Sequence, residues 1–301
     1  MRPFTQRPAY TNVLLRGGLG NQMFQYAAGL SVALRTGSRL RLDLTVLDRD
    51  RKRRFRLDQF NIDAELVHGD DAPPLQFSDP RTLAAEARAR FDAQVVIQRD
   101  ETFGDELSDT AANSLLVGYW QSDRYFNSVS DAVRAHFKLR RPSAAYTELR
   151  RRIGAEECAA VHIRRGDYAE DTSVQRVIGL LDASYYREAA NELVARTGVT
   201  NFLVFSDDPE WCRTRVELPG DVEITSGYLA DAEELHLISA CDHAIVSNSS
   251  FSWWGAWLGT KAKSVVIAPS RWLRSVDARA ASRIPARWTT LPAEFVPANV
   301  E

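Results

Sequence analysis

The chain has 301 residues, of which 45% are hydrophobic and 26% charged, a composition typical of a globular protein with room for two domains. Its formal net charge of −2 creates no overall field that would attract nucleic acid, so we expect no nucleic-acid partner. The three cysteines are widely spaced and form no Cys-x-x-Cys pattern, which argues against a disulfide framework and against a structural zinc site.

The first half of the chain alternates strands with helices. We predict an apolar strand at Asn12–Arg16, a glycine-rich loop at Gly17–Gln22 and an amphipathic helix at Gln22–Arg35, where apolar residues recur at helical spacing. A second strand follows at Arg39–Leu44. This order is the start of a Rossmann-like domain. Later elements of this half are a helix at Leu83–Phe91, a strand at Leu115–Trp120 and a helix at Tyr125–Phe137.

The second half repeats the alternation. Strands are predicted at Cys158–Ile163, Asn201–Phe205, Val222–Ile224, His243–Val246 and Ser264–Ala268, and helices at Ser184–Thr197, Pro209–Arg215 and Asp231–Ala240. This pattern predicts an α/β protein with two Rossmann-like domains that face each other across a cleft, residues 1–150 and 151–301. The C-terminal tail, rich in Arg and Pro, is a candidate for crossing back to the first domain.

The strand at Cys158–Ile163 ends in two arginines, Arg164 and Arg165, followed by Gly166 and Asp167. Ligand groups of α/β folds lie just past the carboxyl ends of buried strands, and Arg offers a planar fork that matches phosphate oxygens. Side chains alternate along a strand, so His162 and Arg164 should share one face and Arg165 the other. A surface pair neutralised by Asp167 is the weaker interpretation, because an unpaired Arg near a core is costly. We therefore predict a grip on a diphosphate.

The loop after the first strand contains Gly17, Gly18 and Gly20 and ends in two amides, Asn21 and Gln22. Glycines let a ligand approach the backbone, and the following helix N-terminus favours anions. The third glycine of a dinucleotide fingerprint would fall at Met23, however, and no Gly-Lys-Ser/Thr follows. A tight turn and a ligand site both remain open.

Two further strand ends carry candidate groups. Asp207 could hold a ribose hydroxyl or orient an arginine, whereas Asp208, just before Pro209, is expected to cap a helix. The run from Ser247 to Ser252 offers hydroxyls and an amide to phosphate or sugar, and a helix that opens at Phe251 or Ser252 would add its N–H groups. Three tryptophans at helical spacing, Trp253, Trp254 and Trp257, are more often core residues than part of a cofactor site, and we expect at least one to pack against the core and none to be catalytic. The Glu234 carboxylate could accept the two parallel hydrogen bonds that guanine offers.

Asp48 and Asp50 form an Asp-x-Asp pattern, which could hold Mg²⁺ or Mn²⁺ at a diphosphate. The basic residues in the rest of the run Arg49–Arg56 would repel a divalent cation, so we expect no metal there. The run itself is expected to be a solvated loop; contact with anionic lipid or an anionic glycan carrier is the weaker alternative.

Taken together, these motifs resemble the bacterial α-1,2-fucosyltransferases of glycosyltransferase family 11. The resemblance rests on Gly17–Ala27 (GGLGNQMFQYA), Gly118–Phe126 (GYWQSDRYF), Val161–Tyr168 (VHIRRGDY), Phe205–Trp211 (FSDDPEW) and Ser247–Leu258 (SNSSFSWWGAWL), in the family's order. It implies a GT-B fold with an N-terminal acceptor-side domain and a C-terminal donor domain. It also implies an inverting, metal-independent transfer of L-fucose from GDP-β-L-fucose to the 2-hydroxyl of a β-galactoside, with no cofactor.

The resemblance also implies roles for individual residues. Arg164 would hold the β-phosphate beside Arg165, with His162 and Asp167 near nucleotide and acceptor. Asn21 would reach the reaction centre from the loop that includes Gly18, Gly20 and Gln22. The donor side would include Asp207, Glu234 and the phosphate loop Ser249, Ser250 and Phe251. The catalytic candidates are Arg164, Asp167 and Asn21. Asp167 is the first candidate for the base, followed by Glu170 and Asp171.

The chain departs from the family pattern at Glu234, where the family usually has Asp, and at Ile178-Gly179, where many members have His-Gly. The expected partners are GDP-fucose and a galactose-terminated glycan of O-antigen or capsule type, for which a lipid-linked form is a candidate. No stretch is apolar enough to span a bilayer, so we expect a cytoplasmic protein with at most peripheral contact to the inner face of the membrane. The alternatives are a fucosyltransferase of another linkage, α-1,6 or protein O-type, and a non-catalytic nucleotide-sugar-binding protein.

Overall fold

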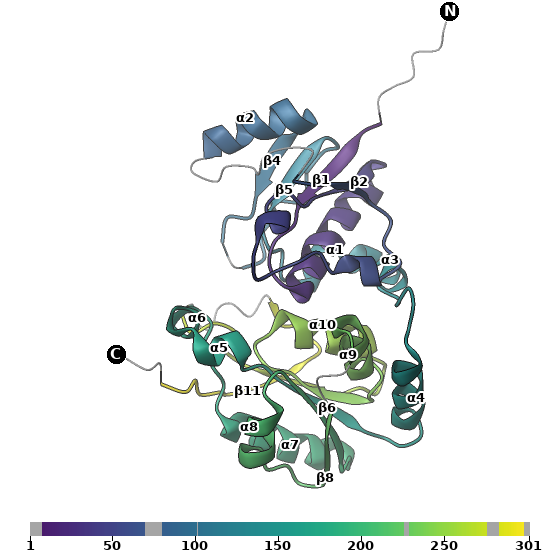
Figure 1. Cartoon of the computed structure of the whole chain (residues 1–301), viewed down its shortest axis with the longest axis vertical. Coiled ribbons are helices and arrows are strands. Elements are labelled where there is room, and N and C mark those ends of the chain that lie inside the picture. The colour runs from purple at the N-terminus through teal and green to yellow at the C-terminus, as the bar shows by residue number, and fades with distance from the viewer. Residues whose placement is uncertain (1–7, 70–79, 101, 226–228, 276–282, 298–301) are drawn as a thin grey trace, which may run out of the picture. The chain divides into compact units, whose positions relative to one another are not determined.

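The structure is a computed structural model that describes residues 8–69, 80–100, 102–225, 229–275 and 283–297. Its internal contacts divide the chain into two units, residues 1–140 and 141–301. Each unit is described by itself. Both contain a parallel sheet with helices on its faces (Figure 1).

The sheet of the first unit has the strand order β3-β2-β1-β5-β4, and every pairing among its described strands is parallel. The strands are β1 (Tyr10–Leu14), β2 (Arg39–Asp43), β3 (Glu65–Val67), β4 (Gln94–Ile97) and β5 (Ser114–Val117). The chain moves from β1 to β2 in one direction and returns to β5 on the other side of β1. The strand order therefore reverses between β1 and β5.

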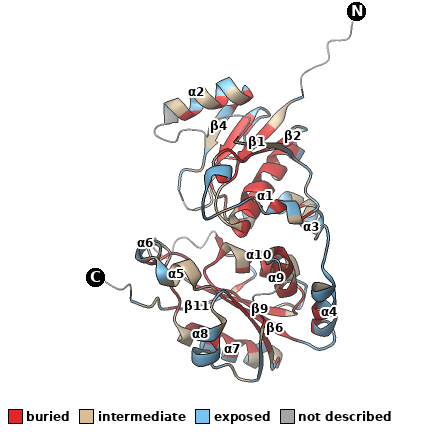
Figure 2. Ribbon diagram, in the orientation of Figure 1, coloured by how far each residue is buried: buried red, intermediate tan, exposed pale blue. Residues whose placement is uncertain are grey.

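Helices cover both faces of this sheet because successive strand residues point to opposite sides. Val13 of β1 faces α1 (Leu19–Thr36), where Gly29 leaves room for its side chain. Leu14 faces α2 (Pro80–Phe91) and packs with Leu83 and Leu115. Most of α1 is buried (Figure 2). The remaining helical segments are the short turns Leu47–Arg49, Leu57–Gln59, Asp123–Tyr125 and Asn127–Val129, and α3 (Ser130–His136).

The sheet of the second unit has the order β11-β10-β9-β6-β7-β8, again parallel throughout its described strands. The strands are β6 (Ala159–Ile163), β7 (Asn201–Ser206), β8 (Asp221–Thr225), β9 (His243–Ile245), β10 (Val266–Pro269) and β11 (Thr289–Leu291). From β6 the chain builds outward through β7 and β8, and then builds the other side through β9, β10 and β11. The order reverses between β6 and β9.

The alternation along β6 assigns the helices of this unit to opposite faces. Ala159, Val161 and Ile163 pack with α7 (Ala183–Thr197) and α8 (Pro209–Arg215). Cys158 and Ala160 pack with α4 (Ala144–Ile153) and α9 (Asp231–Ile238). The other helices are α5 (Gly166–Glu170), α6 (Thr172–Val177) and α10 (Ser250–Gly259). Trp253, Trp254 and Trp257 of α10 are all buried, which confirms that at least one of them lies in the core.

These observations confirm the expected GT-B-type combination of two Rossmann-like α/β domains; a cleft between them stays a prediction. The division falls at Arg140/Arg141 rather than at 150/151, because α4 buries Leu149 and Ile153 against the second unit's core. The tail residues 283–297 belong to the second unit, where Val296 N donates to Leu180 O. In the part of the chain that the structure describes, no helix is long and apolar enough to cross a bilayer.

Candidate functional site

Polar groups gather at the carboxyl-end edge of the second sheet, where the strand order reverses. β6 ends in Arg164 and Arg165, β7 leads into Asp207 and Asp208, and β9 leads into the loop Ser247–Ser249. Open parallel sheets bind their ligands outside this edge at the point of reversal. We call this edge the arginine edge. All its residues come from the second unit.

Arg164 lies at the centre of the arginine edge and is held by two carboxylates. Its Nη1 lies 2.7 Å from Asp207 Oδ2, and its Nη2 lies 2.5 Å from Asp167 Oδ1. Burial alone would lower the pKa of Arg164, but the carboxylates of Asp207 and Asp167 outweigh it and the pKa is raised. The guanidinium is therefore a fixed cation, and 27% of its side chain remains exposed to receive a ligand.

Arg165 points to the opposite face, as the alternation predicts. Its Nε lies 3.0 Å from Asp208 Oδ2, and its guanidinium lies 4.0 Å from the centre of the Trp211 ring. The register explains both pairs of partners. Ile163 pairs with Ser206, so the next two positions of β6 and β7 bring Arg164 beside Asp207 and Arg165 beside Asp208. Trp211 belongs to the motif Phe205–Trp211, but the sequence pattern predicts no role for it at this site.

Each aspartate after β7 has a defined structural task. Asp207 orients the arginines, because its second oxygen also accepts a hydrogen bond from Arg165 N at 2.8 Å. Asp208 caps α8 as predicted, accepting from Trp211 N at 3.1 Å. Of the two tasks proposed for Asp207, the structure thus shows the orientation of an arginine.

His162 shares the face of Arg164 and is buried. Its Nδ1 lies 3.3 Å from Ser247 Oγ, and its ring lies 5.1 Å from that of Phe251. Burial, and secondarily the charge of Arg164, lowers the pKa of His162 to about 3. The imidazole is therefore neutral near pH 7, and it can serve as a hydrogen-bond partner but not as a source of positive charge.

The loop after β9 leads into α10, which begins at Ser250. Ser249 caps the helix by accepting from Phe251 N, and the Ser252 hydroxyl donates to Ser247 O and Ser249 O. No acidic residue lies in the first turn of α10. The helix N-terminus thus presents positive potential beside His162 at the arginine edge.

The three candidate bases differ in their surroundings. Asp167 is half-buried and bound to Arg164. Asp171 caps α6 by accepting from Ser173 N and Val174 N, whereas the side chain of Glu170 is exposed. Asp167 is therefore the candidate that lies at the arginine edge itself.

The guanine candidate Glu234 lies half-buried in the first turn of α9. Its neighbour Glu233 is buried and serves the fold, because its carboxylate accepts from Ser143 N and from Ala230 N. Ile178 and Gly179, where the chain departs from the family pattern, are held through their carbonyls by the amide of Asn248.

The glycine loop of the first unit ends earlier than predicted, because α1 begins at Leu19. Gly20, Asn21 and Gln22 are therefore helical, and Gln22 is buried. The Gln22 amide donates to Gly17 O at 2.9 Å and Arg54 O at 2.8 Å and accepts from Arg56 N at 3.0 Å, so it ties the loop to the basic segment.

Asn21 remains half-buried at the point where the order of the first sheet reverses, and its Oδ1 accepts from Gln121 Nε2 at 2.6 Å. Gln121 belongs to the motif Gly118–Phe126, but the sequence pattern predicts no role for it. The signal available was its place directly after the predicted strand at Leu115–Trp120.

The Asp-x-Asp pattern has other partners. Asp48 accepts from Gly69 N at 2.8 Å, and Asp50 accepts from Lys52 N and Arg53 N. No group of three or more His, Cys, Asp or Glu side chains in the described ranges is arranged to hold a metal ion.

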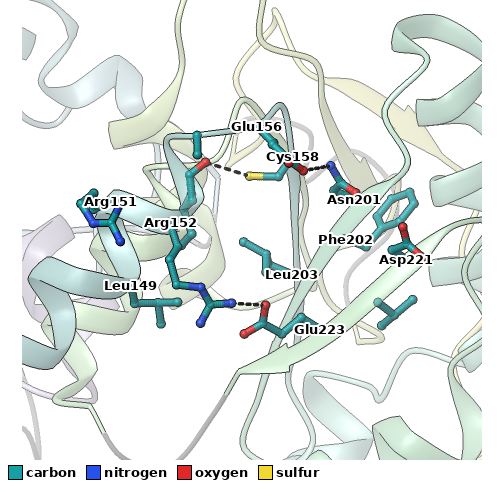
Figure 3. A pocket seen from close by; sticks show the side chains of 13 residues that line it. Leu149, Arg151, Arg152, Glu156, Cys158, Asn201, Phe202, Leu203, Asp221 and Glu223 are labelled. Atoms are coloured by element: carbon teal, nitrogen blue, oxygen red, sulfur yellow. Dashed lines mark hydrogen bonds and ion pairs between the residues drawn. The ribbon is translucent and has the colours of Figure 1, made fainter.

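A cavity of about 530 Å³ lies elsewhere in the second unit, between α4 and the strands β7 and β8. Figure 3 shows its side chains, among them the ion pair of Arg152 and Glu223 at 2.8 Å. Its lining contains none of the residues of the arginine edge.

Comparisons with known proteins agree with the motifs. The profile of glycosyl transferase family 11 matches residues 97–291. Alpha-1,2-colitosyltransferase of Escherichia coli is 31% identical over 283 residues, 92% of this chain and 97% of that protein. O-antigen biosynthesis glycosyltransferase WbnK of Escherichia coli is 28% identical over 282 residues, 86% and 93% of the two chains. Galactoside alpha-(1,2)-fucosyltransferase 1 of Saimiri sciureus is 29% identical over 255 residues, 80% of this chain and 63% of that protein. The chain therefore belongs to glycosyl transferase family 11 and is a glycosyltransferase.

Proposed function

We propose that the protein transfers L-fucose from GDP-β-L-fucose to the 2-hydroxyl of a β-galactoside, with inversion and without a metal ion. The observation that carries the proposal is Arg164, a permanent cation fixed by Asp167 and Asp207 at the carboxyl-end edge where the sheet order reverses. The N-terminus of α10 adds positive potential at the same edge. Such a site suits a ligand with two adjacent phosphates.

The choice of sugar and linkage draws on the relatives. Two of them carry an α-1,2 linkage in their names. One name gives colitose as the sugar that is transferred, and the other gives a galactoside as the acceptor of fucose. A third takes part, by its name, in O-antigen biosynthesis. These names support transfer to a 2-hydroxyl of a galactoside in a surface glycan of O-antigen type, and a capsule glycan is the alternative acceptor.

In the proposed reaction the bond between the fucose anomeric carbon and the β-phosphate oxygen breaks while the acceptor oxygen attacks from the opposite face. Negative charge grows on the departing GDP, and the Arg164 guanidinium with the α10 N-terminus stabilises it. Electrostatic stabilisation of this kind is commonly the largest single contribution to catalysis. The acceptor hydroxyl releases a proton, and Asp167 is our first choice for the base. Neutral His162 supports the donor as a hydrogen-bond partner.

The colitosyltransferase relative favours a second candidate donor. Colitose is L-fucose without its 3-hydroxyl, so GDP-colitose carries the same diphosphate to the arginine edge. A site built to bind the 3-hydroxyl would reject colitose strongly, whereas an apolar site would discriminate only weakly. Relative kcat/KM values for the two donors therefore distinguish these cases.

We also propose that the acceptor is a galactose-terminated glycan, with a lipid-linked form as a candidate, and that the protein acts in the cytoplasm at the inner face of the membrane. The exposed side chains of Arg49, Arg51, Lys52 and Arg54 are compatible with contact to an anionic carrier.

The proposal is tested by incubating the purified protein with GDP-fucose or GDP-colitose and a panel of galactosides, with and without EDTA. We expect a product with a 1→2 linkage and the α configuration that is formed equally well in EDTA. A product of another linkage would point to the α-1,6 or protein O-type alternative. Binding of GDP without turnover would favour the non-catalytic alternative, and strict metal dependence would contradict the role of Arg164.

A further inference from the structure

Two amide side chains of the first unit, those of Gln121 and Asn21, form a hydrogen bond to which the proposed function assigns no role. Gln121 follows β5 and Asn21 lies in the first turn of α1, yet Gln121 Nε2 donates to Asn21 Oδ1 at 2.6 Å. Both lie at the reversal of the sheet order, the place where parallel sheets bind ligands.

The hydrogen bond determines which way the Asn21 amide faces. Because Gln121 donates, the Asn21 oxygen points to Gln121 and the Asn21 nitrogen points to Gly17. A Cβ at position 17 would lie 2.6 Å from Asn21 Nδ2, so the absence of a side chain at Gly17 makes room for the amide. A side chain on the next residue, Gly18, would have only the Arg53 guanidinium nearby, at 3.8 Å. The amide nitrogen thus faces a stretch of backbone that a sugar ring can approach.

The backbone that carries Gln121 is held in an unusual conformation. Trp120 is completely buried and has a φ of 54°, in the left-handed region that bulky residues rarely adopt. The N–H groups of Tyr119 and Trp120 both donate to Gln98 Oε1 at 2.9 Å. Strained backbone of this kind persists only where the surroundings determine it, and it is concentrated at functional sites.

We infer that Gln121 is a positioning residue: it orients the Asn21 amide so that an N–H is presented to an oxygen of the hydroxyl-rich acceptor. The inference rests on the proposed function, since the resemblance places Asn21 at the reaction centre. Gln121 acts through Asn21 and does not itself touch the reacting atoms.

A double-mutant cycle in the transfer assay tests this inference. Gln121→Ala should lower kcat roughly two- to tenfold, the rate equivalent of one neutral hydrogen bond, and leave KM for GDP-fucose unchanged. In the Asn21→Ala background the same substitution should have no further effect, because residues that act as a unit are not additive. Gln94→Ala, at the opposite edge of the sheet, is the matched control and should keep the wild-type rate.

Gln121→Glu separates orientation from structural support. A glutamate at this position accepts where Gln121 donates, so Asn21 must turn its nitrogen to the carboxylate and its oxygen to Gly17. We expect kcat to fall at least as far as in Gln121→Ala, although a hydrogen bond is retained. Wild-type kcat in Gln121→Glu, or additive losses in the cycle, would overturn the inference. Absence of transfer by the wild-type protein would instead contradict the proposed function.

Discussion

Arg164→Ala should abolish most of the transfer activity for two reasons that the structure separates. The first is loss of the cation itself: removing one preorganised donor to a developing negative charge costs about 10²- to 10³-fold in kcat. The second is that Asp167 and Asp207, which lie 2.5 and 2.7 Å from Arg164, lose the cation that balances their negative charge near the proposed phosphate site. Their repulsion adds on the order of 1 kcal/mol. We expect a total loss of about 10³-fold in kcat/KM.

The second contribution can be removed separately. Asp207→Asn in the Arg164→Ala background removes one of these two negative charges, and an Asn oxygen can still accept from Arg165 N. The double variant should therefore be several-fold more active than Arg164→Ala alone. Arg164→Lys keeps the charge but cannot contact both carboxylates and a phosphate at once, so it should be intermediate.

The assay is steady-state transfer from GDP-fucose to a galactoside, with GDP affinity measured in parallel by calorimetry. Both losses should lower the affinity for GDP as well as kcat, because in the proposed reaction the Arg164 guanidinium binds both the donor in the ground state and the departing GDP. Arg213→Ala, which removes an exposed arginine of α8, is the control variant. Turnover of Arg164→Ala within a few-fold of wild type would refute the phosphate role of Arg164.

Three further predictions concern the supporting residues. The pKa of His162 is about 3 in the folded protein and about 6.5 unfolded, so below pH 6.5 the unfolded state binds the extra proton and stability falls as the pH falls. Between pH 7 and pH 5, the free energy of unfolding measured by denaturant titration should fall by about 2 kcal/mol more for the wild type than for His162→Gln. An equal pH dependence of the two proteins would contradict the burial of a neutral imidazole. Gly17→Ala should lower the free energy of unfolding by about 1–2 kcal/mol, measured by denaturant titration, because φ at this position is 81°. It should also lower kcat, because the new Cβ displaces the Asn21 amide. Wild-type stability and kcat in this variant would contradict the contact between Gly17 and Asn21. Asp208→Ala removes the α8 cap and the partner of Arg165, so it should lower the free energy of unfolding by about 1 kcal/mol. Its effect on kcat should be smaller than that of Arg164→Ala. A larger loss of kcat than in Arg164→Ala would assign Arg165 to donor binding.

Much of the local structure could be predicted because it depends on neighbours in the chain. The helix at Pro209–Arg215 and its Asp208 cap were both predicted, since capping needs only residues a turn apart. The predicted start of α1 at Gln22 is too late, because the glycines before it are typical of a loop although the helix already begins at Leu19. Short polar helices such as α5 and α6 have too few apolar positions to show the helical periodicity of 3.6 residues, so the sequence pattern does not predict them.

The order of residues along the chain is enough to predict the chemistry at the strand ends: two arginines, two aspartates and a serine-rich loop, each after an apolar run. The alternation along β6 even predicted that Arg164 and Arg165 face opposite sides. Their partners follow from the fold alone, because the pairing of Arg164 with Asp207 and of Arg165 with Asp208 depends on the register of β6 against β7. The same holds for Gln121 and Asn21, which are 100 residues apart and meet because β5 lies beside β1. The sequence specifies which side chains stand at the strand ends, but the orientation of each side chain depends on the neighbours that the order and register of the strands bring beside it.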